Sequence, residues 1–135
     1  MKNLFLAVLM TVATSTGFAQ QKEFQLSTHI LDVSEGMPAE GVIIKLEKMN
    51  PETKTWEFVA QKKTSESGRV NDFLTLEKNN DGIYRFTFMV EEYYKNKNLE
   101  TFYPFVEVAF QIKGKTHYHV PITLSAFGYS TYRGS

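Results

Sequence analysis

The chain has 135 residues, with 15 basic and 15 acidic side chains, three histidines and no cysteine. This length predicts one domain, and the balanced charge argues against a nucleic-acid-binding surface, which needs a basic patch. Without cysteine, the protein can use neither disulfides nor thiolate chemistry. Its stability must come from an apolar core, helped by association of several copies, because a domain of this size buries a limited fraction of its surface.

Residues 1–19 have the pattern of a secretory signal peptide. Lys2 supplies the positive start, an apolar run over 4–12 follows, and Gly17 and Ala19 place small residues before a cut ahead of Gln20. The apolar run is too short for a membrane-spanning helix, and a buried N-terminal helix is the alternative. We therefore predict a periplasmic or secreted protein, free of the membrane after cleavage, with one domain over 20–135.

The domain is predicted to be all-β, because short runs with alternating polarity are separated by turn residues. Asn79-Asn80-Asp81-Gly82 is the strongest hairpin signal, and the run after it places Tyr84, Phe86 and Phe88 on one face. One short helix of about two turns is expected over 91–98. The predicted strands are 24–33, 42–47, 55–62, 70–76, 84–90, 105–112, 117–124 and 129–134. About eight strands at this spacing predict an antiparallel β-sandwich of two sheets.

The last nineteen residues hold an unusual density of polar and aromatic groups. On a strand, His117 and His119 point to the same side. Val120, Ile122 and Leu124 point to the opposite side and form an apolar face. A turn near Gly128 is expected to return the chain and bring Tyr132 onto the same polar face as His119. This arrangement favours a functional site at the end of the chain.

Three histidines and one arginine are the candidates for chemistry, namely His29, His117, His119 and Arg69. A histidine in a pocket suits a general base, and an arginine suits oxygen-rich groups and developing negative charge. The alternative is that each histidine is an ordinary, partly exposed strand residue. Asp32 follows the His29 strand and is expected to serve the turn there.

Two other catalytic classes leave weaker traces in the sequence. The His-x-His pair with a third histidine fits zinc, which takes three protein ligands and a water in catalytic sites, but any two alternate strand residues satisfy this spacing. A serine nucleophile lacks support, because Gly-x-Ser-x-Gly is absent.

Several segments together resemble the transthyretin-related 5-hydroxyisourate hydrolases over essentially all of 20–135. The ending Tyr-Arg-Gly-Ser separates these hydrolases from transthyretin, the hormone carrier with the same fold. Two positions depart from the family pattern: Ser67 stands where an aspartate is usual, and Thr123 lies in a stretch that is usually leucine-rich. The matching segments are Leu26-Ser27-Thr28-His29-Ile30-Leu31-Asp32, Gly36-Met37-Pro38-Ala39-Glu40-Gly41-Val42, Gly68-Arg69, Phe102-Tyr103-Pro104, His117-Tyr118-His119-Val120-Pro121 and Tyr132-Arg133-Gly134-Ser135.

The resemblance implies a transthyretin-like sandwich whose copies form a homotetramer with a central channel. It implies hydrolysis of 5-hydroxyisourate in urate breakdown, with no cofactor and no metal. By position, it implies that His29, Arg69 and His119 are catalytic, and that His29, Arg69, Tyr132 and Ser135 bind the substrate. The alternatives that stay open are a periplasmic transthyretin-like carrier of a small aromatic molecule and a zinc-dependent hydrolase.

Overall fold

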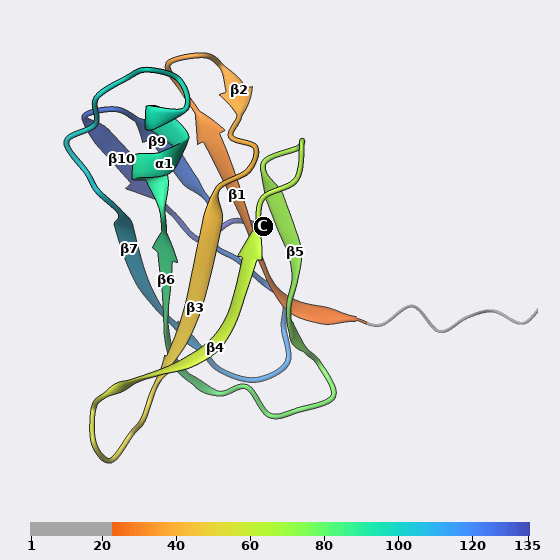
Figure 1. Ribbon diagram of the computed structural model, residues 1–135. Coiled ribbons are helices and arrows are strands. Elements are labelled where there is room, and N and C mark those ends of the chain that lie inside the picture. The colour runs from red at the N-terminus through yellow and green to blue at the C-terminus, as the bar shows by residue number, and fades with distance from the viewer. Residues whose placement is uncertain (1–22) are drawn as a thin grey trace, which may run out of the picture.

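Two β-sheets and one short helix make up the computed structural model, which describes residues 23–135 (Figure 1). The predicted all-β sandwich is confirmed, whereas the predicted signal peptide over 1–19 lies outside the described residues. The elements are β1 (Phe24–Asp32), β2 (Met37–Pro38), β3 (Ile43–Met49), β4 (Trp56–Lys63), β5 (Arg69–Thr75), β6 (Gly82–Phe88), α1 (Val90–Lys95), β7 (Val106–Ile112), β8 (Tyr118–His119), β9 (Ile122–Ser125) and β10 (Gly128–Thr131).

The two sheets are built on different plans. One has the order β4-β3-β6-β7 with antiparallel neighbours throughout. The other has the order β10-β9-β1-β2, with β5 and β8 also paired to β1. In that sheet β1 runs parallel to β8 and β9, where the sequence predicted antiparallel pairing. No hairpin fixes the relative direction of these strands, because all four strands of the other sheet lie between β1 and β8 in the chain.

Several element boundaries differ from the prediction. The predicted strand 117–124 is divided into β8 and β9 at Val120 and Pro121, and proline has no N–H for a continuous ladder. With the short β2, this division gives ten strands rather than about eight. The helix ends at Lys95 because the N–H groups of Lys97 and Asn98 bond three residues back, a tighter turn than the α-helix.

The apolar core lies between the sheets and follows the predicted alternation. Leu26 and Ile30 of β1 are fully buried, as are Phe86 and Phe88 of β6. Leu124 of β9 is also fully buried, and its neighbours on that face, Val120 and Ile122, are nearly so. The polar face of β1 is therefore left for the opposite side of its sheet. Within residues 23–135, no helix has the length and apolar character needed to cross a membrane.

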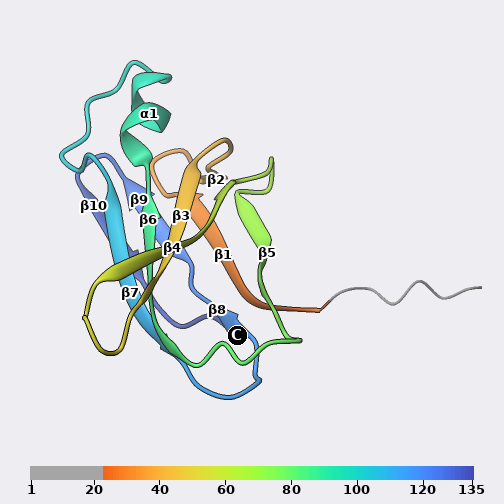
Figure 2. The ribbon, with the colours of Figure 1, turned by 60° about the horizontal axis from the view of Figure 1, so that its bottom comes forward.

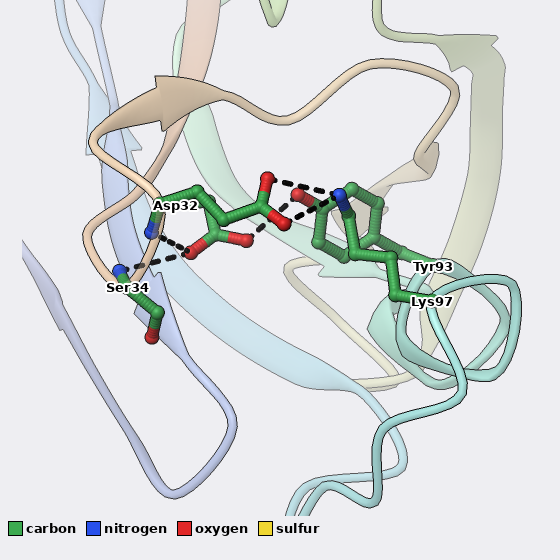
Figure 3. A network of polar contacts seen from close by, with 5 residues as sticks. Asp32, Ser34, Tyr93 and Lys97 are labelled. Carbon is green, nitrogen blue, oxygen red and sulfur yellow. Dashed lines mark hydrogen bonds and ion pairs between the residues drawn. The ribbon is translucent and has the colours of Figure 1, made fainter.

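A buried carboxylate ties α1 to the turn after β1 (Figure 3). Asp32 is 1% exposed, and its Oδ1 accepts the backbone N–H groups of Ser34 (3.0 Å) and Glu35 (3.3 Å). The Tyr93 hydroxyl donates to Oδ2 over 2.7 Å, and Lys97 bonds Glu35 over 2.9 Å. Asp32 thus serves the turn, as the sequence predicts, and fixes the end of the sandwich farthest from β8 (Figure 2).

Replacing Tyr93 by phenylalanine should lower the free energy of unfolding by about 2 kcal/mol, because a hydrogen bond to a buried charged group is lost. Tyr94→Phe is the matched control: its hydroxyl is also buried but has no hydrogen-bond partner among the described residues. Urea unfolding of both variants measures the difference. Equal losses in the two variants would show that the bond to Asp32 does not stabilise the fold.

Candidate active site

A polar pocket lies where β1, β5, β8 and the last residues of the chain meet. Its volume is about 330 Å³, and polar side chains supply most of its wall. The lining residues are Ser27, Arg69, His117, His119, Tyr132, Gly134 and Ser135. Figure 1 shows the C-terminal end of the chain near β1 and β5, and Figure 2 shows it next to β8.

Strand pairing brings these residues together from distant parts of the chain. The antiparallel register of β1 and β5 sets His29 opposite Arg69. The parallel register of β1 and β8 sets Ser27 beside His119. The chain after β10 then returns to β8, where the N–H of Gly134 donates to the His119 carbonyl over 2.8 Å. This bridge holds Tyr132 and Ser135 at the pocket.

The structure brings four of the five predicted site residues into one pocket: Arg69, His119, Tyr132 and Ser135. The fifth, His29, does not line this cavity. It is half-buried on β1, opposite Arg69, and close enough to act electrostatically on His119. Ser67, one of the departures from the family pattern, bonds Ser65 within the turn before Arg69 and is not part of the pocket wall.

Two pocket residues, Ser27 and Gly134, were not predicted as site residues, and a third, His117, was a candidate for chemistry to which the family resemblance gave no role. Alternation did place His117 on the same face as His119, and Ser27 on the same face as His29, so a signal was present. Alternation could not show which strand lies next to β1, and that neighbour decides their role.

Ser27 joins the two histidines of the His-x-His pair. Its Oγ lies 2.8 Å from Nε2 of His117 and 2.8 Å from Nδ1 of His119. The far nitrogen of His117, Nδ1, lies 3.0 Å from the Phe24 carbonyl oxygen. Within residues 23–135, Nε2 of His119 has no hydrogen-bond partner, so it is the nitrogen left available to the pocket.

The electrostatics around the pocket favour the neutral forms of His119 and His29. Burial lowers the pKa of His119, and the positive charge of Arg69 and the neighbouring His29 and His117 lower it further. Burial and then Arg69 also lower the pKa of His29, against an opposing effect from the Ser67 backbone. A neutral imidazole can accept a proton, and the exposed guanidinium of Arg69 can stabilise negative charge. The pocket therefore combines a proton acceptor with an anion-stabilising group, as hydrolysis requires.

No group of three or more histidine, cysteine, aspartate or glutamate side chains gathers closely enough to hold a metal ion within residues 23–135. Two of the three histidines instead share Ser27 as a hydrogen-bond partner.

Gly134 is required by the close approach of the His119 ring. A Cβ at this position would lie 3.1 Å from Cγ and 3.2 Å from Cβ of His119, and would overlap Cδ2. Gly134→Ala should therefore displace the ring and lower kcat/KM at least about tenfold, because small shifts of a catalytic group are costly.

Gly114→Ala is the control for this variant: Gly114 lies in an exposed turn, and a Cβ there meets no atom within 4 Å. Its positive φ of 75° costs some stability, so both variants are compared as folded protein. Undiminished kcat/KM in folded Gly134→Ala would contradict the steric argument.

The comparisons with known proteins agree with this geometry. Residues 26–134 match the HIUase/Transthyretin family. A probable 5-hydroxyisourate hydrolase of Caenorhabditis elegans is 44% identical over 98% of this chain and 97% of its own length. The 5-hydroxyisourate hydrolase of Mus musculus is 39% identical over 82% of this chain and 94% of its own.

Among solved structures, sea bream transthyretin in complex with thyroxine superposes with a TM-score of 0.76. It is 28% identical, with 82% of this chain and 94% of that chain covered. Sequence and fold therefore agree, and the chain belongs to the HIUase/Transthyretin family.

Proposed function

We propose that this protein hydrolyses 5-hydroxyisourate to 2-oxo-4-hydroxy-4-carboxy-5-ureidoimidazoline in urate breakdown. The observation that carries the proposal is the pairing of His119, whose pKa is lowered, with Arg69 in one polar pocket. The 5-hydroxyisourate hydrolases with 39% to 44% identity to this chain support the choice of substrate.

The proposed reaction opens the lactam ring of the substrate. His119, assisted by His29, accepts a proton from a water molecule, and the water oxygen bonds to the ring carbonyl carbon. Arg69 donates hydrogen bonds to the carbonyl oxygen as it becomes negative. The C–N bond then breaks, the proton on His119 passes to the departing nitrogen, and the new carboxylic acid loses its proton to solvent to leave a carboxylate. Tyr132 and Ser135 hold the heterocycle against the pocket wall.

The direct test is the decay of freshly generated 5-hydroxyisourate, followed by ultraviolet absorbance with and without the protein. Catalytic acceleration that rises in proportion to protein concentration is expected. Decay at the spontaneous rate would overturn the proposal.

A carrier function is the second candidate, because sea bream transthyretin was solved in complex with thyroxine. A channel for an apolar ligand favours small or apolar side chains, whereas His119 and Tyr132 are bulky and polar. Isothermal titration with thyroxine separates the two functions. Tight binding without hydrolysis of 5-hydroxyisourate would favour the carrier.

Activity should be insensitive to chelators, because the proposed reaction uses His119 and Arg69 and no metal. The measurement is turnover after exhaustive dialysis against a strong chelator, with metal content checked by elemental analysis. Loss of turnover on dialysis, restored by added zinc, would favour the zinc-dependent hydrolase instead.

We also propose that the working form is a homotetramer. The edge strands β7 and β10 belong to different sheets and end on the same side of the sandwich (Figure 1). Exposed aromatic residues stand on or beside these edges, among them Phe105 at 44%, Tyr129 at 41% and Phe102 at 71% exposure. Pairing of these edges between two copies would cover both, and closed symmetry is the common arrangement of such assemblies.

Two dimers would then meet across the face that carries Thr123 and Ser130, whose hydroxyls bond each other. Thr123→Glu should break this contact, give dimers by light scattering and lower activity, while circular dichroism still reports β-structure. Thr53→Glu, the same change in the exposed turn between β3 and β4, is the control. A fully active dimer would reject the tetramer requirement.

The proposed setting is the periplasm or the secreted fraction, after removal of residues 1–19. The positive start, apolar run and small-residue cleavage site support it. Amino-terminal sequencing of the protein recovered from its native host should begin at Gln20.

A further inference from the structure

A line of three hydrogen bonds runs from the backbone of β1 to the ring of His119. It passes from the Phe24 carbonyl oxygen to His117, from His117 to the hydroxyl of Ser27, and from Ser27 to Nδ1 of His119. Ser27 is 5% exposed, so its hydroxyl is largely shielded from water that would replace these partners.

The direction of each bond follows from the first. A carbonyl oxygen only accepts, so Nδ1 of His117 must carry the proton and donate to Phe24. In neutral His117, Nε2 is then the acceptor and receives the single hydroxyl proton of Ser27. Ser27 has no second proton, so it accepts from His119, whose Nδ1 must be protonated. In a neutral histidine ring, the hydrogen bond made by one nitrogen decides whether the other nitrogen carries the proton.

We propose that Ser27 and His117 are positioning residues that hold His119 in the tautomer protonated on Nδ1, leaving Nε2 free to accept a proton from water. The inference rests on the proposed function, since it assigns a role in that reaction. The bonds persist after proton transfer, because Nδ1–H of the imidazolium still donates to Ser27. The general base therefore needs no rearrangement during turnover.

The surroundings of His119 are consistent with this assignment. The charged and titratable groups around it are Arg69 on β5, His29 on β1, His117 before β8, and Tyr132 after β10. None of these groups forms a hydrogen bond with Nδ1 of His119, whose partner among the described residues is Ser27. The free imidazole of histidine prefers the opposite tautomer, with the proton on Nε2. The hydrogen bond to Ser27 therefore reverses the tautomer preference of the free ring.

Nitrogen-15 NMR of the histidine side chains tests the proposal without substrate. At about pH 7.5, above the ordinary histidine pKa, His119 of the folded wild-type protein should be protonated on Nδ1. Ser27→Ala should shift His119 toward the Nε2-protonated tautomer, and Ser27→Thr, which keeps the hydroxyl, should restore the wild-type signal. Ser34→Ala, an exposed serine in the turn after β1, is the control.

Kinetics of the same variants give a second readout. Ser27→Ala should lower kcat about tenfold or more with little change in KM, because the hydroxyl that is removed is engaged by His117 and His119. Ser27→Thr and Ser34→Ala should stay close to the wild type. Neither purely structural damage nor loss of substrate contacts predicts a tautomer shift that the conservative variant reverses.

The outcomes separate the two proposals. Nε2-protonated His119 in the wild-type protein overturns the positioning role, and this measurement needs no variant to fold. An unchanged tautomer and kcat in Ser27→Ala also overturn it. A third outcome combines 5-hydroxyisourate decay at the spontaneous rate with NMR evidence that His119 is protonated on Nδ1. It would overturn the proposed function while supporting the hydrogen-bond assignment.

Discussion

His119→Ala is expected to lower kcat/KM for 5-hydroxyisourate at least about a hundredfold, the usual scale for losing a general base. His119 combines the lowered pKa with a free Nε2 in the pocket, and the alanine variant can accept no proton there. The effect should fall mainly on kcat, because the proposed substrate-binding residues Arg69, Tyr132 and Ser135 remain in place. Ultraviolet decay assays over a range of substrate concentrations separate the two parameters.

The His119 ring is only half-buried, so the variant should remain folded. Thr116→Ala, an exposed position on the loop before β8, is the matched control for a change in this segment. Near-wild-type turnover of folded His119→Ala would show that His119 is not the general base, and His29 would become the candidate.

Arg69→Ala should also lower kcat/KM at least about a hundredfold, because its guanidinium is the only fixed cation among the described residues that line the pocket. Arg69→Lys keeps the charge but loses the forked donor geometry, so an intermediate loss is expected. Lys62→Ala is the control: this cation pairs with Asp72 outside the pocket. Arg69→Ala with unchanged kcat/KM would reject the stabilising role.

The same variant has a second, independent effect on the pH profile. Arg69 lowers the pKa of both His119 and His29, so its removal should raise both. In the wild type, the active neutral histidine persists as pH falls below the ordinary histidine range. In Arg69→Ala, activity should begin to fall at a higher pH. A profile that does not move would show that Arg69 does not act on the base.

The sequence alone predicts much of the sandwich, because each strand carries its own pattern. The alternation of Tyr84, Phe86 and Phe88 holds in the structure, where all three are buried. The parallel pairing of β1 with β8 and β9 was not predictable in this way, since alternation shows the face of a residue and not its neighbouring strand. The division at Pro121 agrees with the sequence, because proline lacks the N–H that a continuous ladder needs.

The candidate site also has residues that the sequence could predict and residues that depend on which strands are neighbours. Resemblance to the family named five residues. The structure brings Arg69, His119, Tyr132 and Ser135 into one pocket, and His29 does not line it. Ser27 was missed because its importance depends on a partner 92 residues away, His119. Serine carries no chemical signal of its own on a strand, and only the register of β1 and β8 makes it a link between two histidines.

The central position of β1 has a consequence for how the protein acquires its activity. This strand borders β2, β5, β8 and β9, and the pocket needs its pairing with both β5 and β8. Such pairing joins segments far apart in the chain, which slows folding because loops must close before distant contacts form. A partly folded chain has no pocket, so turnover should return during refolding only with the last, slowest phase.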